Sequence, residues 1–544
     1  MSCRIYGWIL NNGTKTLFKA VWCSLCGILF WRAFVDYKYS PEYIYLHQIL
    51  GIWLCIARAS AAVLHMNLAA VLIPLCRGLA LWGNRMLIKF GLGLTWLRWS
   101  ATSFHVFIGN IIMIFTVIHV VAHSFNTINF SINTDDNVAG LHPFPNQTQA
   151  YEVCLSILIF TVPGATGLLM TIILCVLFWT SLQTVRRRFF NMFWYSHRLA
   201  VVLLLPLLLV HGHRGPLRRQ INTDRHFPGC NLTLAPFEDS LLPVNGSNQP
   251  EQHCLDAAKF DHIPCSSWQW LILPLILYCC DVVYRMIRRS HKVTDFSVTF
   301  VSDNVLELAV KSTFIKAKPG QYVLLNCPVI SSLEWHPFTV SEVPCTANEH
   351  ILKLMIGRAG DWTDELFNRL SSRQQCTEST TTTRHNGDEM FRIDGPFTSP
   401  LEHIDGYKDA VIVTGGVGVA PVLAWCRRFK HAEKSHRICI IFVTRDDLLL
   451  KFVELICEQH RSKVVNIQTK AELYYTGQRK LSQHETFSKG RPNIRAILHN
   501  LNHKKGSKVG VFVCGPPPMC KEAKRICLDL SSRNVQYVCH KETI

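Results

Sequence analysis

The chain has 544 residues, of which 49% are hydrophobic and only 17% are charged. Soluble proteins carry about 25% charged residues, so this composition excludes a disordered chain and an ordinary soluble protein, and the length excludes one compact domain. Lysine and arginine exceed aspartate and glutamate by 18. That excess could serve nucleic acid, anionic lipid or phosphorylated substrates, and only the placement of the charges decides.

Six apolar stretches before residue 290 are long enough to cross a bilayer, which takes about 17 to 25 residues. They are expected near Phe18–Val35, Ile44–Met66, Phe104–Phe125, Val153–Leu182, Phe193–His211 and Trp268–Val283. The first is interpreted as a span, because its apolar part is too long for a cleavable signal and no small-residue cleavage site follows. The sequence therefore predicts a six-helix, all-α transmembrane domain over residues 1–290.

The connections between the stretches predict a multi-pass protein with both chain ends in the cytosol. Basic residues, which are retained on the cytosolic side, follow the second, fourth and sixth stretches: Arg77, Arg85, Lys89 and Arg98; Arg186, Arg187 and Arg188; and Arg285, Arg288, Arg289 and Lys292. The other loops are expected to carry exoplasmic glycosylation sequons at Asn129, Asn146, Asn231 and Asn245. A sequon at Asn12 falls on the cytosolic side and should be unused. Topology thus accounts for the basic excess without nucleic acid.

Two predicted spans each carry a histidine pair with a spacing of fourteen residues: His105 and His119 in the third, His197 and His211 in the fifth. Fourteen residues rise about 21 Å and return within about 40° of four full turns, so each pair lies on one helix face near the two sides of the membrane core. Since both spans run outward, His105 should face His197 at an inner level and His119 should face His211 at an outer level.

Two facing imidazoles at each level match the axial ligands of two bis-histidine hemes between apolar walls. Zinc fits less well, because two ligands per level without a helical carboxylate make a poor zinc site, and core histidines with a shared spacing are the other alternative. Pro206 lies between His197 and His211 and can kink the fifth span.

Two further ionisable residues lie in the predicted spans. Arg58 lies about a dozen residues into the second stretch, near mid-membrane, where it could pair with a heme propionate or stabilise a reduced-oxygen anion. His123 lies one turn beyond His119 on the same face. The alternatives are a lipid or carbonyl contact for Arg58 and an interfacial hydrogen bond for His123.

The remainder of the chain changes to short strand-like runs and then to strands alternating with helical segments. An antiparallel β-barrel over residues 291–402 and a doubly wound α/β domain over residues 403–544 are expected. In the barrel, His336-Pro337-Phe338-Thr339 supplies an extended strand with an aromatic ring and a hydroxyl. Gly360-Asp361-Trp362-Thr363 supplies a helix N-terminus suited to the pyrophosphate of a flavin.

In the α/β part, the apolar run Ala410–Val413 leads into the glycine turn Gly415-Gly416-Val417-Gly418-Val419-Ala420-Pro421. Glycines at such a turn let backbone amides approach a pyrophosphate. Arg445, Arg491 and Cys514-Gly515-Pro516 follow strand ends or lie in adjacent loops, where open α/β sheets bind ligands. The two arginines could bind a 2′-phosphate, which favours NADPH over NADH; solvated surface charge is the alternative.

Taken in this order, the membrane histidines and the motifs HPFT, GDWT, DGPF (Asp394–Phe397), GGVGVAP, GRP and CGP resemble the NADPH oxidase family of the ferric reductase superfamily over nearly the whole chain. The resemblance implies two heme b groups fused to a ferredoxin-reductase-like module for FAD and NADPH. By this resemblance, the iron ligands are His105, His119, His197 and His211, the HPFT residues bind FAD, and the glycine turn, Arg445, Arg491 and the CGP residues bind NADPH. Oxygen is then reduced beside Arg58 and His123.

A branch of this family that mainly releases hydrogen peroxide is resembled by three short motifs and by the long loop expected on the exoplasmic side. The motifs are Pro41-Glu42-Tyr43, Leu46-His47-Gln48 and Arg58-Ala59-Ser60-Ala61, and the loop contains His226, Pro228-Gly229-Cys230 and Cys254. The resemblance implies that His226 donates protons that speed superoxide dismutation, and that the small phagocyte-oxidase membrane subunit is the partner. The endoplasmic reticulum or the plasma membrane is the expected location. Cys230, Cys254 and Cys265 face the oxidising side, so one disulfide is expected with one cysteine left over.

Three positions depart from the family pattern: Ala420 where Thr is usual, Thr444 where Cys is usual, and a chain that ends at Ile544 where the family places a Phe on the flavin. A different or a weakened flavin shield is therefore expected. A ferric-chelate reductase with the same cofactors is the nearest alternative function. A non-catalytic membrane subunit or proton channel is the alternative of another class.

Overall fold

The structure of the chain is a computed structural model. The structure describes residues 3–76, 78–79, 83, 101–133, 141, 149–228, 230–232, 253–254, 256–289, 292–312, 315–318, 320–342, 350–375, 382–428, 436–461, 467–479, 486–501 and 506–542. The chain divides into two compact units, one of residues 18–282 and one of residues 1–17 with 283–544. Each unit has its own architecture.

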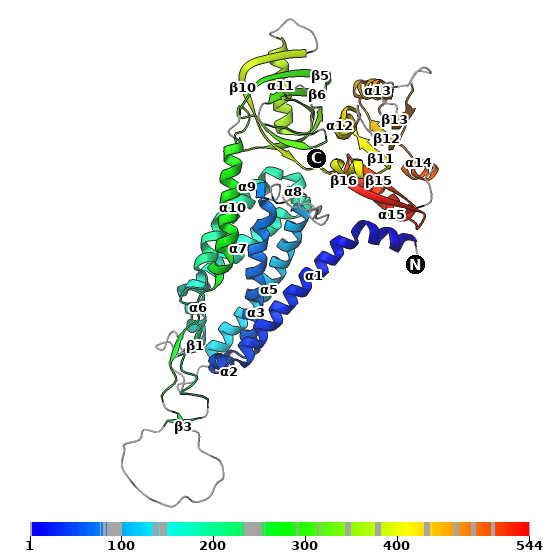
Figure 1. Cartoon of the computed structure of the whole chain (residues 1–544). Helices are drawn as coiled ribbons and strands as arrows, with labels where there is room; N and C mark the ends of the chain where they lie inside the picture. Colours follow the sequence, from blue (N-terminus) through cyan, green and yellow to red (C-terminus); the bar gives the residue numbers. More distant parts are fainter. Residues whose placement is uncertain are drawn as a thin grey trace, which may run out of the picture. The chain divides into compact units, whose positions relative to one another are not determined.

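Six helices among the described residues are long and apolar enough to cross a membrane, which confirms the predicted multi-pass bundle. They are α1 (Cys3–Tyr39), α3 (Ile52–Leu72), α5 (Ala101–Ile132), α7 (Val162–Ser181), α9 (Phe190–Val210) and α10 (Ser267–Arg289) (Figure 1). Shorter helices connect them: α2 (Ile44–Leu50), α6 (Ala150–Phe160), α8 (Gln183–Arg188) and the 3-10 turns Pro41–Tyr43 and Ile73–Leu75. Within the bundle, α3 packs along α5 and α7 packs along α9.

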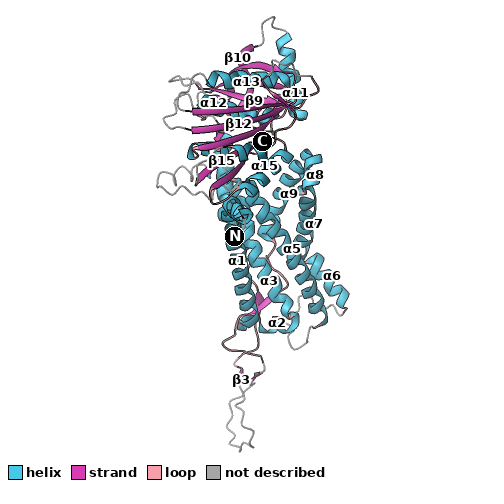
Figure 2. Cartoon of the chain, turned by 90° about the vertical axis from the view of Figure 1, so that its right-hand side faces the viewer, coloured by secondary structure: helices cyan, strands magenta, loops and turns pink. Residues whose placement is uncertain are grey.

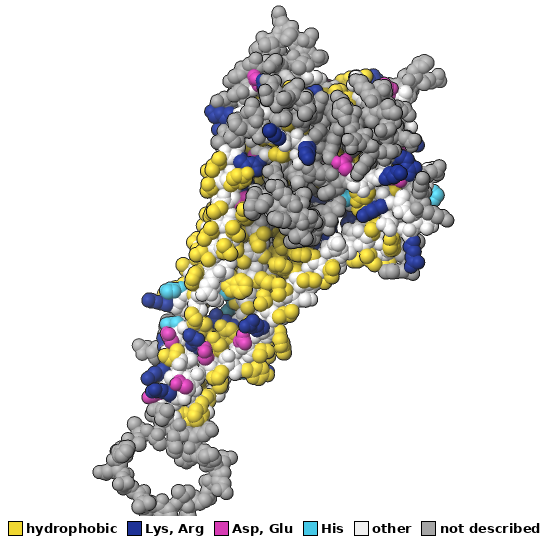
Figure 3. Space-filling view, in the orientation of Figure 1, with side chains coloured by type: hydrophobic (Ala, Val, Ile, Leu, Met, Phe, Trp, Pro, Cys, Tyr) yellow, Lys and Arg dark blue, Asp and Glu magenta, His cyan; other side chains and the backbone are white. Residues whose placement is uncertain are grey.

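The outward surface of the bundle is apolar, as a lipid-facing surface must be. Large side chains such as Val202 and Leu273 are more than 60% exposed, and hydrophobic side chains (yellow in Figure 3) cover the helices. Leu54, Val63 and Ile108 are fully buried between helices. Because helices satisfy their backbone hydrogen bonds internally, such a bundle can expose apolar side chains to lipid without exposing polar backbone groups.

Three local predictions for the bundle are wrong. The second stretch breaks at Gly51, whose φ of 63° ends α2, so the span begins at Ile52 and Arg58 is its seventh residue, well short of mid-membrane. The fourth stretch breaks at Thr161, whose hydroxyl caps α7 by accepting from the Gly164 N–H. Asn129 lies inside α5 and not in a loop. Arg77, Arg85, Lys89, Arg98, Asn146 and Asn245 lie outside the described residues.

The barrel is closed and antiparallel, in the strand order β10-β5-β6-β9-β8-β7. Its strands are β5 (Lys292–Ser302), β6 (Val305–Ser312), β7 (Tyr322–Asn326), β8 (His336–Glu342), β9 (His350–Gly357) and β10 (Thr382–Phe397). Alternating side chains from these strands fill one apolar core, which α11 (Asp361–Gln375) joins through Leu366 and Phe367.

The last domain is a parallel six-stranded sheet in the order β14-β13-β12-β11-β15-β16. Its strands are β11 (Asp409–Gly415), β12 (His436–Thr444), β13 (Ile467–Tyr475), β14 (Ser488–Lys489), β15 (Ser507–Cys514) and β16 (Val535–Glu542). Figure 2 shows helices beside these strands. The helices of this domain are α12 (Ala420–Arg428), α13 (Asp447–Arg461), α14 (Ile494–Asn500) and α15 (Pro517–Leu530). Two 3-10 turns lie at Pro400–Gly406 and Gly416–Val419. The two faces of the sheet pack into two separate apolar cores: Ile412 and Ile440 lie in one, and Val411 and Ile441 lie in the other. Burial of both faces is what a doubly wound sheet requires.

The strand order places a topological switch point beside β11. From β11 the chain builds outward through β12, β13 and β14, then returns to the other side of β11 with β15 and β16. In open α/β sheets, ligands bind at the carboxyl ends of the strands at such a point. Here the turns after β11 and β15 are the glycine turn and the Cys514-Gly515-Pro516 turn.

Candidate functional site

The four membrane histidines lie in two facing pairs between α5 and α9. The ring centres of His105 and His197 are 6.0 Å apart, and those of His119 and His211 are 6.4 Å apart. The helix period thus delivers one pair to each of two levels, and Pro206 lies within a continuous α9 without displacing either pair.

Each of the four imidazoles has its Nδ1 atom next to a hydrogen-bond acceptor. The Nδ1 of His119 lies 3.0 Å from the Ala57 carbonyl, and that of His105 lies 3.2 Å from the Val71 carbonyl. On α9, the Nδ1 of His211 lies 2.8 Å from Thr166 Oγ1, and that of His197 lies 3.4 Å from Ser181 Oγ. Because a carbonyl can only accept, His105 and His119 carry their proton on Nδ1, which leaves Nε2 with a lone pair.

This arrangement fits an iron porphyrin. Two iron–nitrogen bonds of about 2 Å, with the distance from each nitrogen to its ring centre added, separate the rings of a bis-histidine site by about 6 Å. Hydrogen bonding of the second ring nitrogen is the usual way in which a protein orients a histidine ligand. The buried Nε of Arg58 has no hydrogen-bond partner among the described residues, as expected for a donor that awaits an anionic group such as a propionate.

Arg58 and His123 both lie at the outer level. Arg58 follows Ala57, whose carbonyl accepts from His119, and its guanidinium lies 5.5 Å from the ring centre of Tyr37. The ring centres of His119 and His123 are 4.6 Å apart. The outer level therefore holds a cation and an additional imidazole beside the pair His119 and His211.

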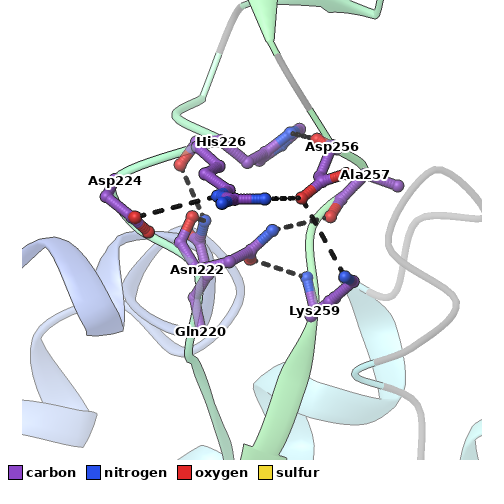
Figure 4. A network of polar contacts seen from close by, with 8 residues as sticks. Gln220, Asn222, Asp224, His226, Asp256, Ala257 and Lys259 are labelled. Atoms are coloured by element: carbon purple, nitrogen blue, oxygen red, sulfur yellow. Dashed lines mark hydrogen bonds and ion pairs between the residues drawn. The ribbon is translucent and has the colours of Figure 1, made fainter.

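His226 belongs to a polar network in the loop between α9 and α10, next to the strands β1 (Arg218–Gln220) and β4 (Phe260–His262) (Figure 4). Its Nδ1–H donates to the Asp256 carbonyl at 3.0 Å, and its Nε2 lies 2.7 Å from the Tyr45 hydroxyl. The Gln220 amide donates to the His226 carbonyl at 2.7 Å. Burial raises the pKa of Tyr45, which keeps its hydroxyl protonated.

Two cysteines of this loop form a disulfide. Cys230 and Cys254 are joined with Cα atoms 5.4 Å apart, and Cys265 is free. Cys230 comes directly before the short strand β2 (Asn231–Leu232), and Cys254 ends the short strand β3 (His253–Cys254), which pairs with β2. With both sulfurs in a disulfide, His226 and these cysteines offer no thiolate to a metal.

The flavin motifs meet in the barrel. The ring centres of His336 and Trp362 are 4.2 Å apart, and those of Phe338 and Trp362 are 6.4 Å apart. The Thr363 hydroxyl accepts from the N–H groups of Ala359 and Gly360 at the start of α11. The buried indole N–H of Trp362 has no partner among the described residues, which fits a site that awaits the acceptors of a nucleotide.

The glycine turn of β11 packs closely against the turn of β15. A Cβ on Gly418 would lie 2.6 Å from the Cys514 carbonyl oxygen, and one on Gly415 would lie 3.1 Å from Pro516. Gly416 has a φ of 55°, a conformation that favours glycine. Only glycines allow this backbone approach, and the buried Thr414 hydroxyl beside it has no partner among the described residues.

Arg445 and Arg491 lie at the same edge of the sheet. The register aligns Thr444 of β12 with Tyr475 of β13, and Tyr475 with Lys489 of β14. The residues that follow these three strands therefore lie at the same edge of the sheet. Both arginine side chains are exposed. They are therefore available to a phosphate, as the 2′-phosphate hypothesis requires.

Glu542 is a site residue that the sequence analysis missed. It ends β16, pairs in register with Cys514, and accepts a hydrogen bond from the Thr339 hydroxyl at 3.2 Å. It therefore joins the HPFT motif to the CGP turn. Burial raises the pKa of Glu542 to about 7, so this carboxyl can hold or release a proton near neutral pH.

Two levels of facing imidazoles, together with a flavin-type barrel and a parallel nucleotide-type sheet, define a membrane-bound reductase. Three family models match the chain: the ferric reductase like transmembrane component over residues 59–208, an FAD-binding domain over 290–401 and the ferric reductase NAD binding domain over 479–528.

The chain belongs to the NADPH oxidase family. It is 33% identical to NADPH oxidase 4 of Rattus norvegicus over 97% of both chains, and 31% identical to NADPH oxidase 4 of Homo sapiens over 98% of both. It is 29% identical to NADPH oxidase 1 of Mus musculus over 98% of this chain and 95% of that one. It is thus an oxidoreductase that generates reactive oxygen species with NADPH, FAD and heme.

Proposed function

We propose that the protein carries electrons from cytosolic NADPH across the membrane to oxygen on the exoplasmic side, releasing superoxide and mainly hydrogen peroxide. When bound, FAD would take up the electron pair of NADPH as a hydride and the hemes would carry single electrons, so the bound cofactors would divide the pair that NADPH donates. The cytosolic sites correspond to residues 291–402 for FAD and 403–544 for NADPH, and the bundle to residues 1–290.

The observation that supports this proposal best is the state of the four imidazoles. All four Nδ1 atoms face acceptors within 3.4 Å, and the paired rings are separated by the distance that an iron between them requires. Histidines that only filled a core would not need four such partners and two matched separations.

The other residues take roles that follow from their positions. His336–Thr339 and Gly360–Thr363 hold FAD, and the glycine turn, Gly515 and Pro516 admit the pyrophosphate and nicotinamide of NADPH. Arg445 and Arg491 bind its 2′-phosphate. Glu542, which is hydrogen-bonded to the Thr339 hydroxyl, supplies or takes up a proton where the barrel meets the α/β domain.

On the exoplasmic side, Arg58 and His123 attract and hold the anion that forms when oxygen takes an electron. His226 and Tyr45 form a pair that can pass a proton, which would speed the conversion of superoxide into peroxide.

By resemblance to NADPH oxidase 4, the small phagocyte-oxidase membrane subunit is the partner and the endoplasmic reticulum or plasma membrane is the location. Both chain ends are cytosolic.

The test is an anaerobic reduced-minus-oxidised spectrum of detergent-purified full-length protein, followed by product identification in air. Wild type should show b-type heme absorption and NADPH-driven oxygen consumption. His119→Leu should abolish the consumption, and His213→Leu, at an exposed histidine near His211, should leave it intact. Consumption that persists in His119→Leu would contradict the route. Ferrous iron formed in preference to peroxide would favour the ferric-chelate reductase instead.

A further inference from the structure

Helix α7 presents a hydroxyl to α9 at each of the two histidine levels. Thr166 faces His211 and Ser181 faces His197. We propose that Thr166 is a positioning residue for the outer heme, and that it keeps the reduction potential of that heme low through its hydrogen bond with His211. This inference depends on the proposed heme ligation.

The direction of the hydrogen bond follows from the single proton of the hydroxyl. Thr166 Oγ1 donates to the Val162 carbonyl at 2.6 Å, one turn back in α7. Its oxygen can then only accept from the Nδ1–H of His211, at 2.8 Å. The hydroxyl therefore fixes the tautomer of His211 and turns the Nε2 lone pair toward His119.

A neighbouring glycine makes this contact possible. A Cβ on Gly167 would lie 3.2 Å from Cε1 of His211, which is tighter than most Cβ contacts and would push the ring away by a few tenths of an ångström. The absence of a side chain at Gly167 lets the His211 ring lie close against α7, within reach of the Thr166 hydroxyl.

The inner level provides an internal comparison. Ser181 Oγ also donates one turn back, to the Leu177 carbonyl at 2.6 Å, but the Nδ1 of His197 lies 3.4 Å away, at the limit of a hydrogen bond. A donated Nδ1–H makes an imidazole more electron-rich and favours oxidised iron. The shorter bond at Thr166 should therefore lower the potential at the outer level more than Ser181 does at the inner level. A low potential there favours the passage of an electron to oxygen.

The experiment is an anaerobic redox titration of full-length, detergent-purified protein, followed by heme absorption. Thr166→Val keeps the shape of threonine and removes the acceptor, Thr166→Ser restores it, and Ser181→Ala is the control at the other level. We expect two hemes per chain in all variants, one titration wave moved to higher potential in Thr166→Val, that wave restored in Thr166→Ser, and a smaller shift confined to the other wave in Ser181→Ala.

Heme content separates the possible failures. Two hemes in Thr166→Val with both waves unchanged would overturn the role of Thr166 and leave the proposed function intact. Loss of one heme in Thr166→Val but not in Thr166→Ser would support the positioning role, whereas loss in both would overturn it. Wild type without heme would refute the proposed function itself.

Discussion

The carboxylate of Asp394, in the DGPF motif, is fully buried between two arginines. Arg288 Nη2 lies 2.9 Å from one oxygen and Arg289 Nε lies 3.1 Å from the other, and the Arg289 guanidinium lies 4.5 Å from the ring centre of Trp335. A buried carboxylate is tolerated only when it is paired in this way. Asp394 therefore joins the end of α10 to the barrel strand β10.

We expect Asp394→Asn to destabilise the protein by about 3 kcal/mol, because it removes the negative charge that both partly buried arginines contact. Thermal unfolding of the purified full-length protein, followed by flavin release, measures the loss. Asp364→Asn is the matched control, since Asp364 has a 51% exposed side chain in its contact with Arg358 and should matter by less than about 0.5 kcal/mol. Equal melting temperatures for the two variants would contradict the role of Asp394.

Glu542 gives a prediction for pH dependence. Its pKa is raised by burial to about 7, whereas an unfolded Glu titrates near 4.3. The folded state thus favours the protonated carboxyl, so the stability contributed by Glu542 is complete below about pH 4 and is lost as the pH rises through 7. Glu542→Gln mimics the neutral form and should remove up to about 3 kcal/mol of this loss.

Denaturant unfolding of wild type and variant at pH 5 and at pH 8 measures this difference. Glu522→Gln, at an exposed position of α15, is the control and should follow the wild type at both pH values. If wild type and Glu542→Gln lose the same stability between the two pH values, Glu542 does not titrate as we infer.

Among the elements, the first turns of α1 close the edge of the parallel sheet. β16 is an edge strand, and such strands expose unpaired backbone groups. The Asn11 side chain satisfies two of them, because it donates to the Tyr537 carbonyl at 3.0 Å and accepts from the Cys539 N–H at 2.8 Å. Gly7 allows the approach, since a Cβ there would lie 2.4 Å from the Leu528 carbonyl oxygen.

We expect Asn11→Ala to destabilise this edge by about 1 to 3 kcal/mol, because the Cys539 N–H loses its bond to Asn11 and the Tyr537 carbonyl keeps only the longer contact with the Ser531 hydroxyl at 3.3 Å. Hydrogen exchange of β16 amides in the full-length protein should accelerate by one to two orders of magnitude. Asn12→Ala is the control, since the Asn12 side chain makes only exposed contacts with Trp8 and Lys524. Equal exchange in both variants would show that α1 does not protect the edge.

The elements also show where sequence reasoning stops. The length of the apolar stretches predicts the six spans, because a helix that crosses a bilayer needs about 20 apolar residues. It does not reveal the breaks at Gly51 and Thr161, because apolar residues continue on both sides of each break. The result is a shifted depth for Arg58, which lies at the outer level.

At the scale of the whole molecule, the parts of the site that were predictable are those that repeat along the chain. Helix geometry places His105 and His119 on one face, because they are fourteen residues apart. The acceptors of their Nδ1 atoms do not follow from helix geometry, because every residue has a carbonyl and hydroxyls are common. Glu542 escaped notice because its neighbours Thr339 and Cys514 come together only through the strand order.

Glycosylation tests the proposed topology of the whole chain. Asn231→Gln should remove one glycan from protein expressed in cells, because the proposed topology places the loop of Asn231 on the exoplasmic side. Asn129→Gln should remove none, although its sequon is on the same side, because Asn129 lies within α5 and its amide donates to the Leu50 carbonyl at 3.0 Å.

Asn12→Gln should also leave the gel mobility unchanged, since the proposed topology places the start of α1 in the cytosol. Mobility before and after enzymatic removal of N-glycans measures each case. A glycan lost in Asn12→Gln would reverse the orientation of the bundle. It would place Arg58 and the pair His119–His211 on the cytosolic side, where the proposed release of peroxide into the exoplasm could not occur.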